Sequence, residues 1–223
     1  MRPTAFLAFI SIAIACNEEK QKLDYSGYRD SSFVLVTMNE RQEWKDSIAT
    51  IKLKVPEQLD TFYQWHRQSD CLTCGRRQYR FADTRYVQFA ESGFFWDYVP
   101  DSVFQFTFIH DPVILKKNRT LGKLNPSDTS YLPAYLANHC TFCDEFSFLF
   151  KKYEIINNRP FILTAFVSKC SLLTQNKPSL FIGAATYLKN MALFIVAEKT
   201  GSDTTGFANL IHKSIASLEI EER

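Results

Sequence analysis

The stretch EFSFLFKKYEIINNRPFILTAFVS (residues 145–168) decides the fold, because it holds two strands and the turn between them. Both flanking runs are rich in strand-forming residues, and the asparagines at 157–158 tolerate the left-handed backbone that tight turns need. The same plan recurs in PSLFIGAATYLKNMALFIVAE (178–198). The sequence therefore predicts two successive β-hairpins. The second is almost wholly apolar, so we expect its strands in the centre of a sheet that is covered on both faces.

The segment TTGFANLIHKSIASLEIEE (204–222) follows these hairpins and predicts a helix. Asp203 or Thr204 is suited to cap its first turn. We therefore expect an amphipathic C-terminal helix that lies across the sheet. The apolar residues that recur at helical spacing are Phe207, Leu210, Ile211, Ile215 and Leu218.

Shorter strand signals precede the hairpins. SFVLVTM (32–38) predicts a first strand, and IKLKV (51–55) and VFQFTFIH (103–110) alternate between apolar and polar residues. Strands in a meander followed by a helix are typical of the α+β class. We therefore expect one domain over residues 32–223, an antiparallel β-sheet meander packed against helices that include the C-terminal amphipathic helix.

From residue 145 onward, the order of the expected elements resembles the ending of PsbP-like domains. In that family two hairpins lead into a final helix and a short terminal strand, which corresponds here to residues 218–220. The resemblance is one of pattern and covers the C-terminal third of the chain. It implies a non-catalytic binding or assembly module, and some members of the family are lipoproteins.

The first residues of the chain predict an export signal. The run AFLAFISIAIA (5–15) carries no charge and follows Arg2. A hydrocarbon core requires roughly 20 residues, so this run is too short for a comfortable membrane span. A short positive end, an apolar core and small residues at its close are typical of a secretory signal peptide, which we assign to residues 1–15.

The end of this signal resembles the lipobox of bacterial lipoproteins, in the sequence Ala13-Ile14-Ala15-Cys16. In that class the chain is cut before the cysteine, which then carries a thioether-linked diacylglycerol and usually an amide-linked acyl chain such as palmitate. Two or more chains hold a protein stably on a membrane. We therefore expect lipid attachment at Cys16, with plain secretion or an uncleaved anchor as alternatives.

Residues 16–31 are polar and have no apolar period, so they predict a flexible tether. Glu18 and Glu19 resemble the acidic signals that send some bacterial lipoproteins to the outer face of the outer membrane. We therefore expect a lipid-anchored protein of the outer membrane in the cell envelope. Its domain faces either the cell surface or the periplasm.

Two CxxC pairs are the strongest local motif after the signal. CLTCG contains Cys71 and Cys74, and CTFCDE contains Cys140 and Cys143. An exported chain meets an oxidising compartment, so structural disulfides are the default, either within each pair or between the pairs. Four thiolates also suit tetrahedral zinc, and a CxxC at the start of a helix suits redox chemistry. Cys170 remains without an assigned role.

Composition and motifs limit the possible functions. The formal net charge of the full chain is +2, which gives no global field that attracts nucleic acid. The sequence holds no Gly-rich phosphate loop and no motif of a known hydrolase, so we expect a non-enzymatic protein with no cofactor. The leading interpretation is a membrane-anchored lipoprotein that binds a small ligand or an envelope protein. The alternative is an envelope thiol-redox or zinc-binding protein that uses the CxxC pairs.

Overall fold

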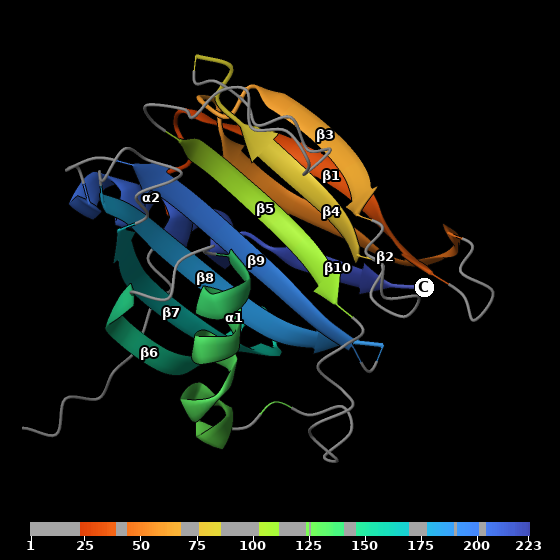
Figure 1. Ribbon diagram of the computed structural model, residues 1–223. Coiled ribbons are helices and arrows are strands. Elements are labelled where there is room, and N and C mark those ends of the chain that lie inside the picture. Colours follow the sequence, from red (N-terminus) through yellow and green to blue (C-terminus); the bar gives the residue numbers. More distant parts are fainter. Residues whose placement is uncertain are drawn as a thin grey trace, which may run out of the picture.

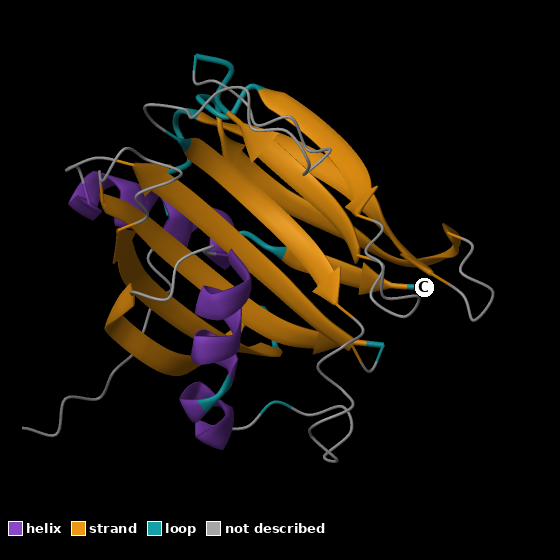
Figure 2. Ribbon diagram, viewed as in Figure 1, coloured by secondary structure: helices purple, strands orange, loops and turns teal. Residues whose placement is uncertain are grey.

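The computed structural model of the protein describes ten strands, two α-helices and one short 3-10 helix (Figures 1 and 2). The strands are β1 (Tyr28–Met38), β2 (Trp44–Pro56), β3 (Thr61–Arg67), β4 (Arg76–Ala82), β5 (Phe104–Asp111), β6 (Phe146–Ile156), β7 (Arg159–Lys169), β8 (Pro178–Leu188), β9 (Met191–Thr200) and β10 (Glu219–Glu222). The helices are α1 (Leu132–Cys140), α2 (Thr204–Ala216) and the 3-10 helix η2 (Pro126–Ser130). The described residues are 23–38, 44–67, 76–85, 103–111, 124, 126–140, 146–169, 178–189, 191–200 and 204–223.

The fold is mostly β, and the expected α+β class is wrong. The strands form two antiparallel sheets, one of seven strands in the order β3-β4-β5-β9-β8-β7-β6 and one of three in the order β1-β2-β10. The described part of the chain holds only two α-helices, and both are short. The class differs because β1 and β2 do not continue the meander. They leave it and pair with the C-terminal strand, so one sheet packs mainly against another sheet rather than against helices (Figure 1).

Both predicted hairpins are confirmed. β6 pairs with β7 around Asn157 and Asn158, whose φ angles of 48° and 64° are left-handed. β8 pairs with β9 around Lys189, which has a φ of 48°. β8 and β9 lie in the interior of the large sheet, and their side chains are buried on both faces over 180–185 and 192–197, as their apolar sequence predicts.

The small sheet joins the first two strands of the chain to its last strand. β2 is its central strand, and the alternation predicted for 51–55 is confirmed, since Ile51, Leu53 and Val55 are buried. β10 pairs with β2 in antiparallel fashion, with Glu219 opposite Lys52. The last residues of the chain therefore complete a sheet that its first strands begin.

A first hydrophobic core fills the space between the two sheets and beneath α2. Aromatic rings dominate one part of it: the ring of Phe33 on β1 lies 4.8 Å from that of Tyr79 on β4 and 5.1 Å from that of Phe108 on β5. The backbone N–H of Val36 donates a hydrogen bond of 2.9 Å to the Tyr79 hydroxyl, which ties the two sheets together. The buried residues of α2 that join this core are Phe207, Ile211 and Ile215.

A second core lies on the opposite face of the large sheet, beneath α1 (Figure 1). Leu132 and Leu136 of α1 are buried there, and the rings of Phe166 and Phe181 stack beneath the helix at 4.8 Å. A side chain at Gly183 of β8 would overlap Leu136 Cδ2, so only glycine lets the helix approach this closely. The large sheet is therefore covered on both faces at its centre.

The described residues begin before the domain boundary that the sequence predicts. β1 starts at Tyr28, inside the segment expected to be tether, and residues 23–27 are described as well. Among the described helices, none combines the length and the apolar character that a membrane crossing requires.

Candidate ligand-binding groove

An open groove of about 630 Å³ lies on the outer side of the small sheet, next to the end of α2. A volume of this size is typical of sites for small molecules. Four segments that are distant in the sequence meet there. The lining residues are Tyr25, Asp30, Ser31, Ser32, Lys52, Leu53, Lys54, Asn157, Ala216, Ser217 and Glu219.

The floor of the groove carries charges of both signs. Lys52 and Lys54 alternate with buried residues along β2, so their side chains point away from the core. Lys54 Nζ lies 2.7 Å from Asp30 Oδ1 on β1, and Lys52 forms an ion pair with Glu221 on β10. Because acids flank the central strand on both sides, the floor presents paired charges rather than a field of one sign.

One wall of the groove is the junction between α2 and β10, and it is fastened by side-chain hydrogen bonds. The Ser217 hydroxyl donates to the carbonyl of Ser214 at 2.7 Å and accepts from the backbone N–H of Lys54 at 2.8 Å. The Asn157 amide, from the β6–β7 turn, donates to the carbonyl of Leu218 at 2.9 Å. The left-handed turn of the first hairpin therefore has a second role, because it braces this wall.

Another wall is the N-terminal segment, and two hydrogen bonds join it to α2. Lys213 Nζ donates to the carbonyl of Asp24 at 2.8 Å, and the Tyr28 hydroxyl donates to the carbonyl of Leu210 at 2.9 Å. The Tyr25 ring packs edge-on against Tyr28, with ring centroids 5.7 Å apart. Burial raises the pKa of Tyr28 to about 12, so this phenol stays a donor at neutral pH.

Tyr25 and Lys54 together form the most ligand-like corner of the groove. Lys54 Nζ lies 5.4 Å from the centroid of the Tyr25 ring, within the range of a cation–π contact. Burial raises the pKa of the Tyr25 phenol, and the charge of Lys54 opposes that rise. The corner therefore combines a protonated phenol, an aromatic ring and an ammonium group, which suits reversible binding of a polar molecule.

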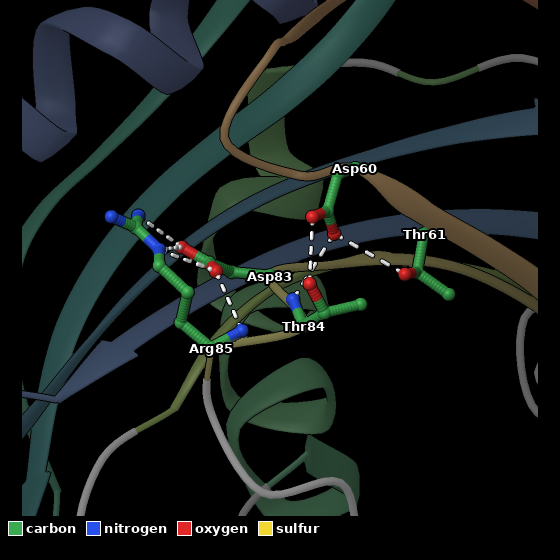
Figure 3. A network of polar contacts seen from close by, with 5 residues as sticks. All are labelled: Asp60, Thr61, Asp83, Thr84 and Arg85. Carbon is green, nitrogen blue, oxygen red and sulfur yellow. Dashed lines mark hydrogen bonds and ion pairs between the residues drawn. The ribbon is translucent and has the colours of Figure 1, made fainter.

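A second polar network, at the ends of β3 and β4, has a structural role (Figure 3). Asp60 accepts hydrogen bonds from the backbone N–H and the hydroxyl of Thr84, at 3.1 and 2.7 Å. The buried carboxylate of Asp83 accepts from Arg85 Nε at 2.9 Å, and this hydrogen bond lowers the pKa of Asp83. No group of three metal-ligating side chains occurs among the residues that the structure describes. The network therefore fastens the loop after β4 to the β2–β3 connection.

A third polar group lies on the large sheet at the same end as this network. Gln105 Nε2 donates to Glu198 Oε2 at 2.7 Å, and the Ser179 and Thr200 hydroxyls lie 3.1 Å apart beside them. Burial raises the pKa of Glu198, while the hydrogen bond from Gln105 and the charge of Arg80 oppose that rise. These side chains share hydrogen bonds with one another, so they form a satisfied patch of the sheet rather than a binding surface.

The predicted site residues fall almost entirely outside the described residues. This applies to Cys16, Cys71, Cys74 and Cys143, and of Cys140 the structure describes only the backbone, at the end of α1. Their expected roles therefore stay predictions.

The strand register nevertheless bears on which cysteines can pair. The connection that holds Cys71 and Cys74 joins Arg67 to Arg76, and the ladder places these two residues at the end of the large sheet where β8 turns into β9. Phe146, which follows the second CxxC pair, lies at the opposite end of that sheet. At about 3.4 Å per residue the strands between these ends are roughly 30 Å long. A bridge within each pair needs no such span, so we predict local bridges; the side chains of all four cysteines lie outside the described residues.

Sequence reasoning missed the groove because no single segment contains it. The one available signal was the outward alternation of Lys52 and Lys54 in IKLKV, which marks an exposed face of charged residues. Tyr25, Asn157 and Ser217 give no such signal, since only the tertiary fold brings them together.

Comparison with known proteins adds no relative. No protein-family model matches the chain, and a search of curated proteins finds no significant match.

Proposed function

We propose that the chain is an exported lipoprotein, held at the cell envelope through Cys16, whose domain binds a polar ligand in the groove without converting it. Two features support this proposal. The lipobox-like end of the signal predicts the anchor, and the groove supplies charged and aromatic contacts next to the point where the chain leaves the anchor. The proposed partner is a small polar molecule or an exposed polar segment of an envelope protein.

The observation that carries the proposal is that Tyr25, nine positions after Cys16 in the sequence, lines the groove. The N-terminal segment is fastened to α2 from Asp24 onward, and Tyr25 of that segment lines the groove. Only seven residues lead from Cys16 to Leu23. A chain of this length spans at most about 25 Å when fully extended. A lipidated Cys16 would therefore hold the groove near the membrane surface and restrict it to ligands of the envelope.

The charge pairs in the groove favour exchange with a ligand. Lys54 is half-buried and Asp30 is exposed, and ion pairs open to solvent contribute only about 0 to 1 kcal/mol. A ligand with its own charged and hydroxyl groups can therefore displace Asp30 from the Lys54 ammonium at a small free-energy cost. The Tyr25 ring adds a flat apolar surface against which such a ligand packs.

Site-specific photocrosslinking in living cells tests this function. A photoreactive amino acid replaces Ser32, an exposed residue that lines the groove. The matched control carries the same amino acid at Ser127, an exposed serine of η2 on the other side of the molecule. The proposal predicts a light-dependent adduct from position 32, which disappears when Lys54 is replaced by Glu.

Two results would contradict the proposal. One is the same set of adducts from positions 32 and 127, because the groove then has no selective ligand. The other is an adduct from position 32 that the Lys54→Glu change leaves untouched, because the lysine then takes no part in binding.

A further inference from the structure

β6 is an open edge of the large sheet. The strand order ends at β6, so within the described part of the chain it has β7 on one side and no strand on the other. Such an edge presents backbone N–H and C=O groups that can pair with another strand. β6 is eleven residues long, which is enough for a stable strand pair.

Three large apolar side chains are exposed on this strand. Leu149 is 59% exposed, Phe150 is 42% exposed and Ile155 is 61% exposed. Edge strands that stay solvated are usually short or carry mainly polar side chains. The exposed apolar residues, together with the open backbone, mark β6 as an interaction surface.

We infer that the partner of β6 is β6 of a second copy of the chain, paired antiparallel around a two-fold axis. The register of such a strand pair supports this choice of partner. In a sheet that continues across such an axis, opposed residues lie on the same face. Two positions of one strand can therefore oppose each other only if their residue numbers differ by an even number.

The charges of β6 select one such register. A two-fold axis at Lys151, Lys152 or Glu154 places that residue against its own copy, and like charges directly opposite each other destabilise a strand pair. An axis at Tyr153 instead places Lys152 opposite Glu154 of the second copy, and the symmetry repeats this pair. Among the axes within 151–154, only the one at Tyr153 therefore satisfies the charges.

The shape of the strand selects the same register. The register of β6 with β7 shifts between Phe148 and Phe150, and the hairpin turn begins at Asn157. The regular part of the strand therefore runs from Phe150 to Ile156, and Tyr153 is its midpoint. Phe150 then opposes Ile156 of the second copy, and Ile155 packs on the aliphatic stem of Lys151 of the second copy.

The charged pair is already arranged within one chain. Lys152 Nζ lies 2.6 Å from Glu154 Oε2 of the same strand, on the same face. Association therefore exchanges a partner within the strand for the identical partner across the interface. A single charge reversal therefore disturbs both the ion pair within one strand and the ion pair between the two copies, and the test has to separate these two effects.

Sedimentation equilibrium of the whole exported chain tests the inference. The chain carries Cys16→Ala so that no detergent micelle brings copies together, and the protein concentration is varied. The first variants are Lys152→Glu and Glu154→Lys. The matched control is Glu57→Lys, which makes the same charge change as Glu154→Lys at an exposed residue of the β2–β3 connection, outside the proposed interface. We expect the starting protein to form dimers reversibly, each of the first two variants to weaken the dimer about tenfold, and the control to leave it unchanged.

Mixing the two weakened variants separates pairing between copies from pairing within one strand. Lys152→Glu leaves acids at both positions of its strand, and Glu154→Lys leaves lysines at both positions, so every opposed pair in a mixed dimer is complementary. We expect the equimolar mixture to recover the dimer. A starting protein that stays monomeric at every concentration, equal weakening by Glu57→Lys, or a mixture that associates no better than its components would each overturn the inference.

Discussion

Replacing Gly183 with alanine tests how α1 is seated on the large sheet. Gly183 lies on β8, and its missing side chain would point from the large sheet toward α1. A Cβ added there would overlap Leu136 Cδ2 of α1 and lie 3.1 Å from Thr164 Cγ2 of β7. Leu136 is buried, so its side chain has little room to rotate away, and we expect the helix to be displaced from the sheet.

The size of the effect follows from this overlap. One extra carbon forced into a packed core typically costs about 1 to 3 kcal/mol. In a protein of this size, 2 kcal/mol corresponds to a fall in Tm of roughly 4 to 8 °C. In a strand without such a neighbour, alanine would instead be slightly better than glycine, by about 0.5 to 1 kcal/mol, because glycine loses more backbone entropy on folding.

A double-mutant cycle with Leu136→Ala isolates the contact. Leu136→Ala alone should cost about 3 kcal/mol through the cavity that it leaves. In that background the cavity accepts the new methyl group, so Gly183→Ala should be neutral or stabilising. The measurement is the free energy of unfolding from urea titrations of the four proteins. Equal costs of Gly183→Ala in both backgrounds would refute the packing of α1 against this glycine.

Three further predictions concern buried charges and cysteines. Asp83→Asn should destabilise the protein by about 1 to 2 kcal/mol at neutral pH. Because the pKa of Asp83 is lowered in the fold, thermal scans should show the stability difference between the two proteins shrinking as the pH falls below 3.8. A difference that does not change with pH would contradict the role of Arg85. Glu198→Gln should raise the Tm at neutral pH. Burial raises the pKa of Glu198, so the protein with glutamate loses stability as the pH rises from 4.5 to the raised pKa, and the gain in Tm should vanish in acid. A lower Tm of Glu198→Gln at neutral pH would contradict this prediction. Peptide mapping of the unreduced protein should find Cys71 joined to Cys74 and Cys140 joined to Cys143, whereas a bridge between the pairs would contradict this prediction.

Local signals in the sequence predicted the two hairpins and the central position of the second. The asparagines at 157–158 fix the first turn, and the apolar runs of β8 and β9 leave no polar face to expose. These features depend on residues that are close together in the chain, so the sequence alone predicts them without knowledge of the tertiary structure.

The second sheet could not be predicted in this way. Its defining contact joins Lys52 to Glu219, and nothing in the short run EIEE indicates a partner so distant in the sequence. Without that contact the first strands read as part of one meander, and the expected class was α+β. The groove was missed for the same reason, since Asn157 and Ser217 take part in it only after β10 has closed on β2.

The mass of the mature protein is the most direct test of the proposed function, because the proposed anchor at Cys16 would determine where the groove meets its ligand. Mass spectrometry of the protein purified from membranes should find a chain that begins at Cys16 and carries a diacylglyceryl group with an added acyl chain. The Cys16→Ala protein should lose this mass and leave the membrane fraction. A mature chain that begins elsewhere, or one that begins at an unmodified Cys16, would contradict the account.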